Sequence, residues 1–424
     1  MKPRFILAVC LCLCLLPAAS QAQRLSALAE RPDWSQLEAF QETITHGEFQ
    51  KLLEQVYAPN GAAKGIIEVE ADAAVIKTAL TPPATWRLRF APDAASAKAP
   101  PRFWRPATSL PAPSPEQPLA GLKIALDPGH LGGAWAQMEE RFFQIGESRP
   151  VAEGDMTLRV AGMLAPKLRA LGADVTSVRD AAEPATEARP ETLRDAARSE
   201  LAERGIAAPR EFYHGTDDPL RSSTVQAESE LLFYRISEIR RRADLVNKKL
   251  RPDLVLCLHF NAEAWGDPLH PEFVPRNHLH LLVNGCYSAG ELRLDDQRFE
   301  MLLKLLSRAS PEEVAIADEV ASTLAGATKL PPYQYTTGNA ILAGSNPYVW
   351  ARNLLANRLY HAPVVFLEPY VMNSEVIWER VQAGDYEGEQ MIGGEMRRSI
   401  FREYADAVAD GLRVYYSKAR AAGN

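Results

Sequence analysis

The sequence predicts an α/β fold, a layered sheet flanked by helices, preceded by a small α+β N-terminal domain. From about residue 119 onward, apolar runs typical of strands alternate with amphipathic runs typical of helices. A proline-rich stretch separates this region from a shorter helix-and-strand segment before it. The chain has 424 residues, 46% of them apolar, which suits two or three domains with a sizeable core.

Residues 1–22 have the composition of a secretory signal peptide. Lys2 and Arg4 precede the apolar run FILAVCLCLCLLP, which is too short to span a bilayer, and Ser20–Ala22 suits cleavage. We therefore expect an exported protein whose mature chain begins near residue 23. An uncleaved anchor is the alternative.

Charge and cysteine content exclude some classes of protein. The formal net charge is −7, and without the two basic residues of the signal it is 45 − 54 = −9, which argues against a nucleic-acid or anionic-membrane partner. Three of the five cysteines fall in the signal, leaving Cys257 and Cys286, so a disulfide framework is excluded. One bond between these two and two buried free thiols both stay open.

Residues 23–92 are predicted to form the small α+β domain. Thr45 and Glu48 form a capping box that begins a helix. Three strand-like runs follow it, at 65–70, 74–80 and 85–90. Because no catalytic pattern occurs there, we expect this domain to bind a partner protein or to be a simple appendage. The next stretch, 93–118, carries seven prolines and is predicted to be a linker.

Residues 119–424 are predicted to be the catalytic domain. Its expected strands are 121–129, 173–178, 253–260, 278–285 and 362–369. Its expected helices are 155–172, which Pro166 should kink or break, 227–250, 312–327 and the C-terminal segment. The polar span 180–224 is interpreted as an insertion or lid.

Three of these strands end in residues suited to metal chemistry. The first runs into Asp-Pro-Gly-His and ends at His130, another ends at His259, and the last ends at Glu368. In a layered α/β domain such ends can converge at one edge of the sheet. Two histidines and a carboxylate, with a further carboxylate as general base, are typical of a catalytic zinc site.

The third ligand should lie near His130 in sequence. Glu153 stands just before the following helix, where a carboxylate can reach back over the strand end. Spacing alone does not exclude Glu139, Glu140 or Glu147.

Five motifs occur in an order that resembles a known family. They are LDPGHLGG, EGDMTLRVAGML, IRRRADLVN, LCLHFNA and VVFLEPYVMN, and they span about 121–375. The set resembles the zinc-dependent N-acetylmuramoyl-L-alanine amidases of the amidase-3 type, which are cell-wall hydrolases.

The resemblance implies His130, Glu153 and His259 as Zn²⁺ ligands. It implies Glu368 as the general base, with zinc-bound water as the nucleophile. Asp127 and Asn261 are predicted to fix the orientation of the ligands. Tyr370 and Asn373 are predicted to line the substrate groove.

The expected function is that of an exported zinc amidase in the periplasm or cell envelope. It would hydrolyse the amide between N-acetylmuramic acid and L-alanine in peptidoglycan, and the N-terminal domain would bind an activator or a wall-associated protein. The alternatives are another zinc amidohydrolase or carboxypeptidase on a related scaffold, and a non-catalytic peptidoglycan-binding regulator.

Several positions depart from the family pattern or stay outside it. Leu131 replaces a usual glycine, and the loops 134–150 and 180–224 are enlarged, so they would line or occlude the site. His278 and His280 share one face of a strand and are interpreted as core or surface residues. Arg241 and Arg242 are predicted on a solvated helix face, with one of them able to pair with an acid near the site.

Overall fold

The computed structural model describes residues 24–266 and 270–421, so the predicted signal peptide, 1–22, lies outside the described residues. Within the described part, no helix is both long and apolar enough to cross a membrane. Cys257 and Cys286 are both buried as free thiols.

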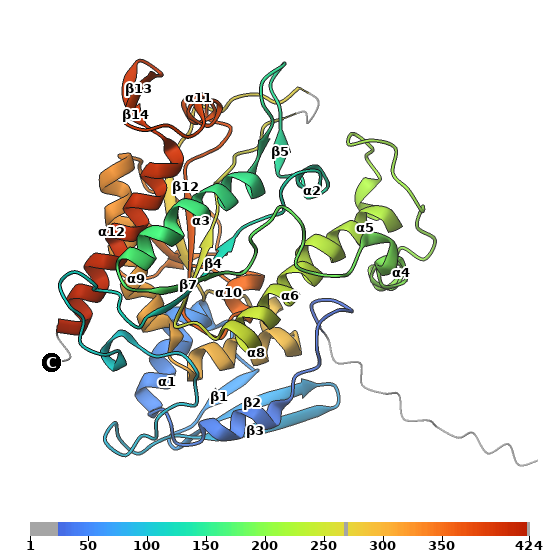
Figure 1. Cartoon of the computed structure of the whole chain (residues 1–424). Coiled ribbons are helices and arrows are strands. Elements are labelled where there is room, and N and C mark those ends of the chain that lie inside the picture. The colour runs from blue at the N-terminus through green and yellow to red at the C-terminus, as the bar shows by residue number, and fades with distance from the viewer. Residues whose placement is uncertain (1–23, 267–269, 422–424) are drawn as a thin grey trace, which may run out of the picture.

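A seven-stranded mixed sheet forms the centre of the molecule (Figure 1). Its strands, in spatial order, are β10 (Ile341–Leu342), β11 (Val349–Ala351), β9 (Leu279–Val283), β12 (Val364–Pro369), β8 (Leu254–Leu258), β4 (Lys123–Pro128) and β7 (Asp174–Ser177). The four strands from β12 to β7 are parallel, whereas β9 runs antiparallel to β12, and β11 follows the direction of β9. The predicted α/β class is confirmed.

Helices cover both faces of this sheet because its buried strands alternate their apolar side chains between two cores. In β4 and β8, even-numbered residues such as Leu256 pack with the helices of one face, which are α3 (Glu153–Ala170), α9 (Ala309–Thr328) and α12 (Ile400–Ala421). Odd-numbered residues of these two strands, such as Cys257, pack with the other face. That face carries α6 (Glu238–Asp244), η8 (Leu245–Leu250) and α10 (Leu355–Leu359).

The long helices agree with the predicted segments. The predicted helix 227–250 is one continuous helix made of α5 (Val225–Leu231), η7 (Leu232–Ser237), α6 and η8. Helix α3 continues through Pro166 without a break. The remaining elements are α2 (Trp135–Met138), β5 (Phe142–Phe143), β6 (Val151–Ala152), η5 (Pro190–Leu193), α4 (Arg194–Glu203), η6 (Arg221–Ser223), α7 (Ala289–Leu292), α8 (Asp295–Leu306), α11 (Glu375–Ala383), β13 (Glu389–Ile392) and β14 (Glu395–Arg398).

The N-terminal segment folds as a helix followed by a three-stranded antiparallel sheet, drawn in blue in Figure 1. The elements are η1 (Trp34–Phe40), α1 (His46–Leu52), η2 (Leu53–Tyr57), η3 (Pro59–Gly61), β1 (Ile67–Val69), β2 (Ala73–Leu80) and β3 (Pro83–Arg89), and η4 (Ala107–Ser109) follows in the proline-rich stretch. Thr45 caps α1, with its hydroxyl accepting from the Glu48 N–H at 3.3 Å. The segment shares one apolar core with α8, and the division of the chain into domains stays a prediction.

Candidate metal centre

Three neighbouring parallel strands bring the predicted residues to one edge of the sheet. His130 follows β4, His259 follows β8, and Glu368 lies one residue before the end of β12. Because β4, β8 and β12 are parallel and adjacent, these ends meet at the same edge. The ring of His259 stacks on Phe366 of β12 with centroids 5.0 Å apart, which places it on the face that α6 and α10 cover.

His130, Glu153 and His259 form a compact cluster of ligand atoms. One donor atom from each residue lies within 4.8 Å of those of the other two. The Nε2 of His130 is 3.4 Å from Oε2 of Glu153, and the Nδ1 of His259 is 3.2 Å from Oε1 of the same carboxylate. Glu153 is the first residue of α3, so a helix N-terminus presents it to the two imidazoles.

The glycine of the Pro-Gly-His turn is required by a close contact with His259. The ring of His259 lies directly over Gly129, where an added Cβ would come within 2.2 Å of His259 Cε1. His130 then takes a φ of 57°, a left-handed conformation that costs a non-glycine residue roughly 1–3 kcal/mol. Backbone strain therefore accompanies the placement of His130 beside His259.

Glu139 contacts His130 on the ring nitrogen that faces away from Glu153. Its Oε1 lies 2.7 Å from His130 Nδ1, and its Oε2 accepts from the Leu131 N–H at 2.7 Å. Burial acts to raise the pKa of Glu139, but the His130 imidazole and the Leu131 N–H hold it below its usual range. With Nδ1–H donated to this carboxylate, Nε2 of His130 is left with a lone pair for a metal. Glu139, one of the rivals for the third ligand, thus orients a histidine in this structure.

Arg242 stabilises the backbone of the same turn through hydrogen bonds. It is 1% exposed and donates to Oδ1 of Asp127 at 3.0 Å and to the carbonyls of Pro128 and His130 at 2.8 and 3.2 Å. Glu238 accepts from its Nε at 2.7 Å. Although burial acts to lower the pKa of Arg242, the carboxylates of Asp127 and Glu238 raise it above its usual value. The predicted solvated position of Arg242 is wrong, whereas the alternative that one of the two arginines pairs with an acid near the site describes Arg242. A buried guanidinium is tolerated where two carboxylates face it.

The hydrogen bonds of Asp127 go to residues other than the three ligands. Its Oδ2 accepts from the Tyr360 hydroxyl at 2.6 Å, and its Oδ1 accepts from Arg242. Its link to the cluster therefore runs through Arg242 and the backbone of the His130 turn. Sequence reasoning missed Tyr360 and left open which of Arg241 and Arg242 pairs with an acid, although the spacing of Glu238 and Arg242 by one helical turn was a readable signal.

The donor set fits a zinc ion. Burial acts to raise the pKa of Glu153, but the imidazoles of His130 and His259 lower it to about 2, so the carboxylate is ionised. Its Oε1 accepts from the Phe260 N–H at 3.0 Å, whereas its buried Oε2 has no hydrogen-bond partner among the described residues. A buried anionic oxygen without a hydrogen bond, 3.4 Å from the His130 Nε2, is a costly arrangement that a bound cation would relieve.

Glu368 lies beside this cluster in a different electrostatic environment. Burial raises the pKa of its carboxyl, and the negative charge of Glu153 adds to the rise, while His259 and His130 oppose it. Two nearby carboxyl groups thus have pKa values shifted in opposite directions, a pattern that marks sites of proton transfer.

The other predicted residues lie farther from the ligands. Asn261 Nδ2 is 3.4 Å from Nδ1 of His280, so it contacts a neighbouring histidine and neither metal-site imidazole. Tyr370 is fully buried on the α12 face, where its hydroxyl donates to Glu403 at 2.8 Å. Asn373 is also buried and clamps the backbone of Glu263 through two hydrogen bonds. The structure does not bring Tyr370 or Asn373 to the ligand cluster.

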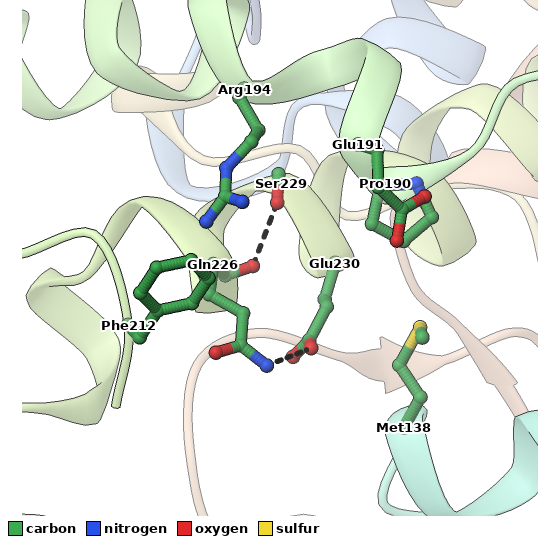
Figure 2. A pocket seen from close by; sticks show the side chains of 8 residues that line it. All are labelled: Met138, Pro190, Glu191, Arg194, Phe212, Gln226, Ser229 and Glu230. Carbon is green, nitrogen blue, oxygen red and sulfur yellow. Dashed lines mark hydrogen bonds between the residues drawn. The ribbon is translucent and has the colours of Figure 1, made fainter. Parts of the chain in front are cut away.

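The two enlarged loops lie beside the His130 turn. In the loop 134–150, Arg141 Nε comes within 3.9 Å of Oε2 of Glu153. The span 180–224 contributes α4 and packs with α5, η7 and Leu131 in a small core of its own. A cavity of about 140 Å³ opens there, and Figure 2 shows Arg194 and Glu230 among the side chains that line it. None of the predicted metal ligands lines this cavity.

No family model and no curated protein matches this chain. Solved structures similar to it include the N-acetylmuramyl-L-alanine amidase Ami1 from Mycobacterium smegmatis, at 16% identity and a TM-score of 0.36, covering 71% of this chain and 99% of that one. The CwlD amidase from Clostridioides difficile, in complex with the GerS lipoprotein, is 12% identical with a TM-score of 0.38 and coverages of 70% and 100%. The amidase AmiC2 of Nostoc punctiforme is 15% identical with a TM-score of 0.34 and coverages of 70% and 98%.

Proposed function

We propose that this protein is an exported zinc amidase that hydrolyses the amide between N-acetylmuramic acid and L-alanine in peptidoglycan. The observation that carries the proposal is the cluster of His130, Glu153 and His259, in which the buried Oε2 of Glu153 accepts no hydrogen bond from the described residues. The ordered motifs around these residues support the amidase class, and the composition of residues 1–22 supports export.

His130, Glu153 and His259 would hold the zinc ion. When bound, zinc lowers the pKa of a water molecule and polarises a carbonyl group, which suits hydrolysis of an amide at neutral pH. Glu139 and Arg242 keep the His130 turn in place, the first through Nδ1 and the second through the backbone carbonyls.

Glu368 would move the proton. As the water oxygen attacks the lactyl carbonyl carbon, a carboxylate oxygen of Glu368 takes the proton of the water. The same oxygen then returns the proton to the nitrogen of L-alanine as the carbon–nitrogen bond breaks. The products are a free stem-peptide amine and the lactyl carboxylate of muramic acid.

The N-terminal segment would serve a partner. We propose that residues 23–92 bind an activator or a wall-associated protein, linked through 93–118 to a catalytic domain at 119–424. The observed packing of this segment against α8 would couple such binding to the body of the protein.

Mass spectrometry of products from purified peptidoglycan tests the proposed reaction. The mature protein with zinc is expected to release stem peptides with an L-alanine amino terminus, and Glu368→Ala is expected to release none. Cleavage at another bond would favour a different zinc hydrolase. Intact peptidoglycan, with stoichiometric zinc bound and the protein folded, would contradict the amidase proposal.

A further inference from the structure

A polar and aromatic cluster adjoins Glu368 on the side away from the metal ligands. In the antiparallel pairing of β12 with β9, Glu368 lies directly opposite His280. Such cross-strand partners place their side chains on the same face of the sheet, roughly 5 Å apart. Tyr335, from the segment between α9 and β11, covers His280 edge-on with ring centroids 5.6 Å apart.

The donors and acceptors of the hydrogen bonds around His280 follow from the orientation of the Asn261 side-chain amide. Asn261 Oδ1 accepts from the Ala262 N–H at 2.7 Å, which turns its amide nitrogen toward Nδ1 of His280 at 3.4 Å. Because that nitrogen donates, Nδ1 of His280 is the acceptor and its proton sits on Nε2. Nε2–H then donates to the hydroxyl oxygen of Tyr335 at 3.2 Å.

A second donor reaches the same oxygen. Arg352 Nη1 donates to the Tyr335 hydroxyl at 3.4 Å, and the guanidinium lies 5.6 Å from the centroid of the Tyr335 ring. With two donors on its oxygen, the hydroxyl of Tyr335 has its own proton left to donate, and no acceptor for it exists among the described residues. Burial and the nearby Glu368 raise the pKa of Tyr335 to about 12, so the proton is retained at neutral pH.

The positive charge of Arg352 favours a negatively charged ligand group beside Tyr335. The buried Arg358, by comparison, faces the Glu300 carboxylate at 2.6 Å. Arg352 forms no ion pair with any residue in the described ranges. Burial and the charges of His278 and Arg352 lower the pKa of His280 to about 3, so His280 stays neutral and acts as a donor to Tyr335.

We propose that Tyr335 is a substrate-binding residue whose hydroxyl donates a hydrogen bond to a carboxylate or carbonyl oxygen of the stem peptide, beside Glu368. His280 and Arg352 act through Tyr335 and are positioning residues, and Arg352 adds long-range attraction for an acidic peptide. The inference rests on the proposed function, since it names the substrate group that this site would take.

Kinetics on soluble muropeptides test the inference with a matched pair of variants. Tyr335→Phe removes only the hydroxyl and is expected to lower kcat/KM by about 10- to 100-fold, the range for a lost hydrogen bond to a charged group. Tyr348→Phe is the control, because its hydroxyl donates to the Leu330 carbonyl at 3.0 Å and holds the same segment without joining the cluster. Zinc content and melting temperature are measured for both variants to confirm that they fold.

A binding experiment separates this inference from the proposed reaction. Glu368→Gln is expected to bind without cleaving, so it allows affinity to be measured by isothermal titration with a muramyl tripeptide. The double variant Glu368→Gln/Tyr335→Phe is expected to have a Kd about 10-fold higher than Glu368→Gln alone. Equal affinity in that pair, or an equal loss of kcat/KM in Tyr348→Phe, would overturn the role of Tyr335. A wild-type protein that binds the peptide through Tyr335 but cleaves nothing would overturn the amidase function alone.

Discussion

Glu139 and Glu153 contact opposite nitrogens of the His130 ring. Glu139 Oε1 lies 2.7 Å from Nδ1, and Glu153 Oε2 lies 3.4 Å from Nε2. The ring is therefore fixed between two carboxylates, one of which is free to share a metal with it while the other sets the tautomer.

Replacing Glu139 by Gln should weaken zinc binding. We expect a 10- to 100-fold rise in Kd, roughly the cost of losing a carboxylate that orients a ligand histidine. Competition with a chromophoric chelator measures the Kd for zinc. Glu140→Gln is the matched control, since that neighbouring carboxylate is exposed and pairs with Arg221. Equal affinities for the two variants would contradict the role given to Glu139.

Zinc should stabilise the wild-type protein and leave His130→Ala unaffected. A ligand at 100 times its Kd adds about 2.7 kcal/mol to the free energy of unfolding, which raises the melting temperature. Thermal denaturation of chelator-treated protein, with and without added zinc, shows the difference. His214→Ala, an exposed loop substitution, should respond like the wild type. Undiminished zinc content in His130→Ala would rule out this residue as a ligand.

Gly129→Ala should disrupt the site while leaving most of the fold intact. The added methyl group would lie 2.2 Å from Cε1 of His259, so the ring must move, at a cost of about 1–3 kcal/mol. Zinc content by mass spectrometry should fall together with stability. Gly162→Ala in α3 is the control, because nothing lies within 4 Å of its Cβ position, and it should gain about 0.5–1 kcal/mol. A Gly129→Ala protein with full zinc content would show that the turn is less tightly constrained.

Arg242→Met should destabilise the whole protein. The substitution leaves Asp127 and Glu238 buried without their cation, which costs about 3–5 kcal/mol. Urea denaturation measures the loss. Arg241→Met, one residue away and without an ion pair in the described part of the chain, should change stability by less than about 1 kcal/mol. Similar losses for both arginines would mean that the Asp127 contact contributes little.

The sequence predicted the parts of the site that depend on local pattern. An apolar strand that runs into Pro-Gly-His, or into a histidine, must expose that residue at the sheet edge, so His130, His259 and Glu368 were readable from strand ends. The parallel strand order then follows from the helices between them. The convergence of Glu153 with both imidazoles confirms the geometric expectation, while its role as a ligand stays a prediction.

Side-chain contacts between segments far apart in the chain could not be predicted from local sequence pattern. Arg242 lies 115 positions from Asp127 in the chain, so the sequence does not show which distant carboxylate it meets. Spacing favoured Glu153 but did not exclude Glu139, because both lie between β4 and the body of α3. Tyr370 follows its strand with a φ of 63°, and this backbone turn sends its side chain into the α12 core.

Because β9 and β11 run opposite to β4, β8 and β12, the segment that carries Tyr335 is separate in the chain from the segments that carry the predicted metal ligands. The metal-site residues His130 and His259 directly follow β4 and β8, whereas Tyr335 belongs to a segment that precedes β11. That preceding segment contributes no residue to β4, β8 or α3. Under the proposed function, substrate preference would therefore be free to diverge among descendants of this chain while the proposed metal site stays constant, because the two are encoded in different segments.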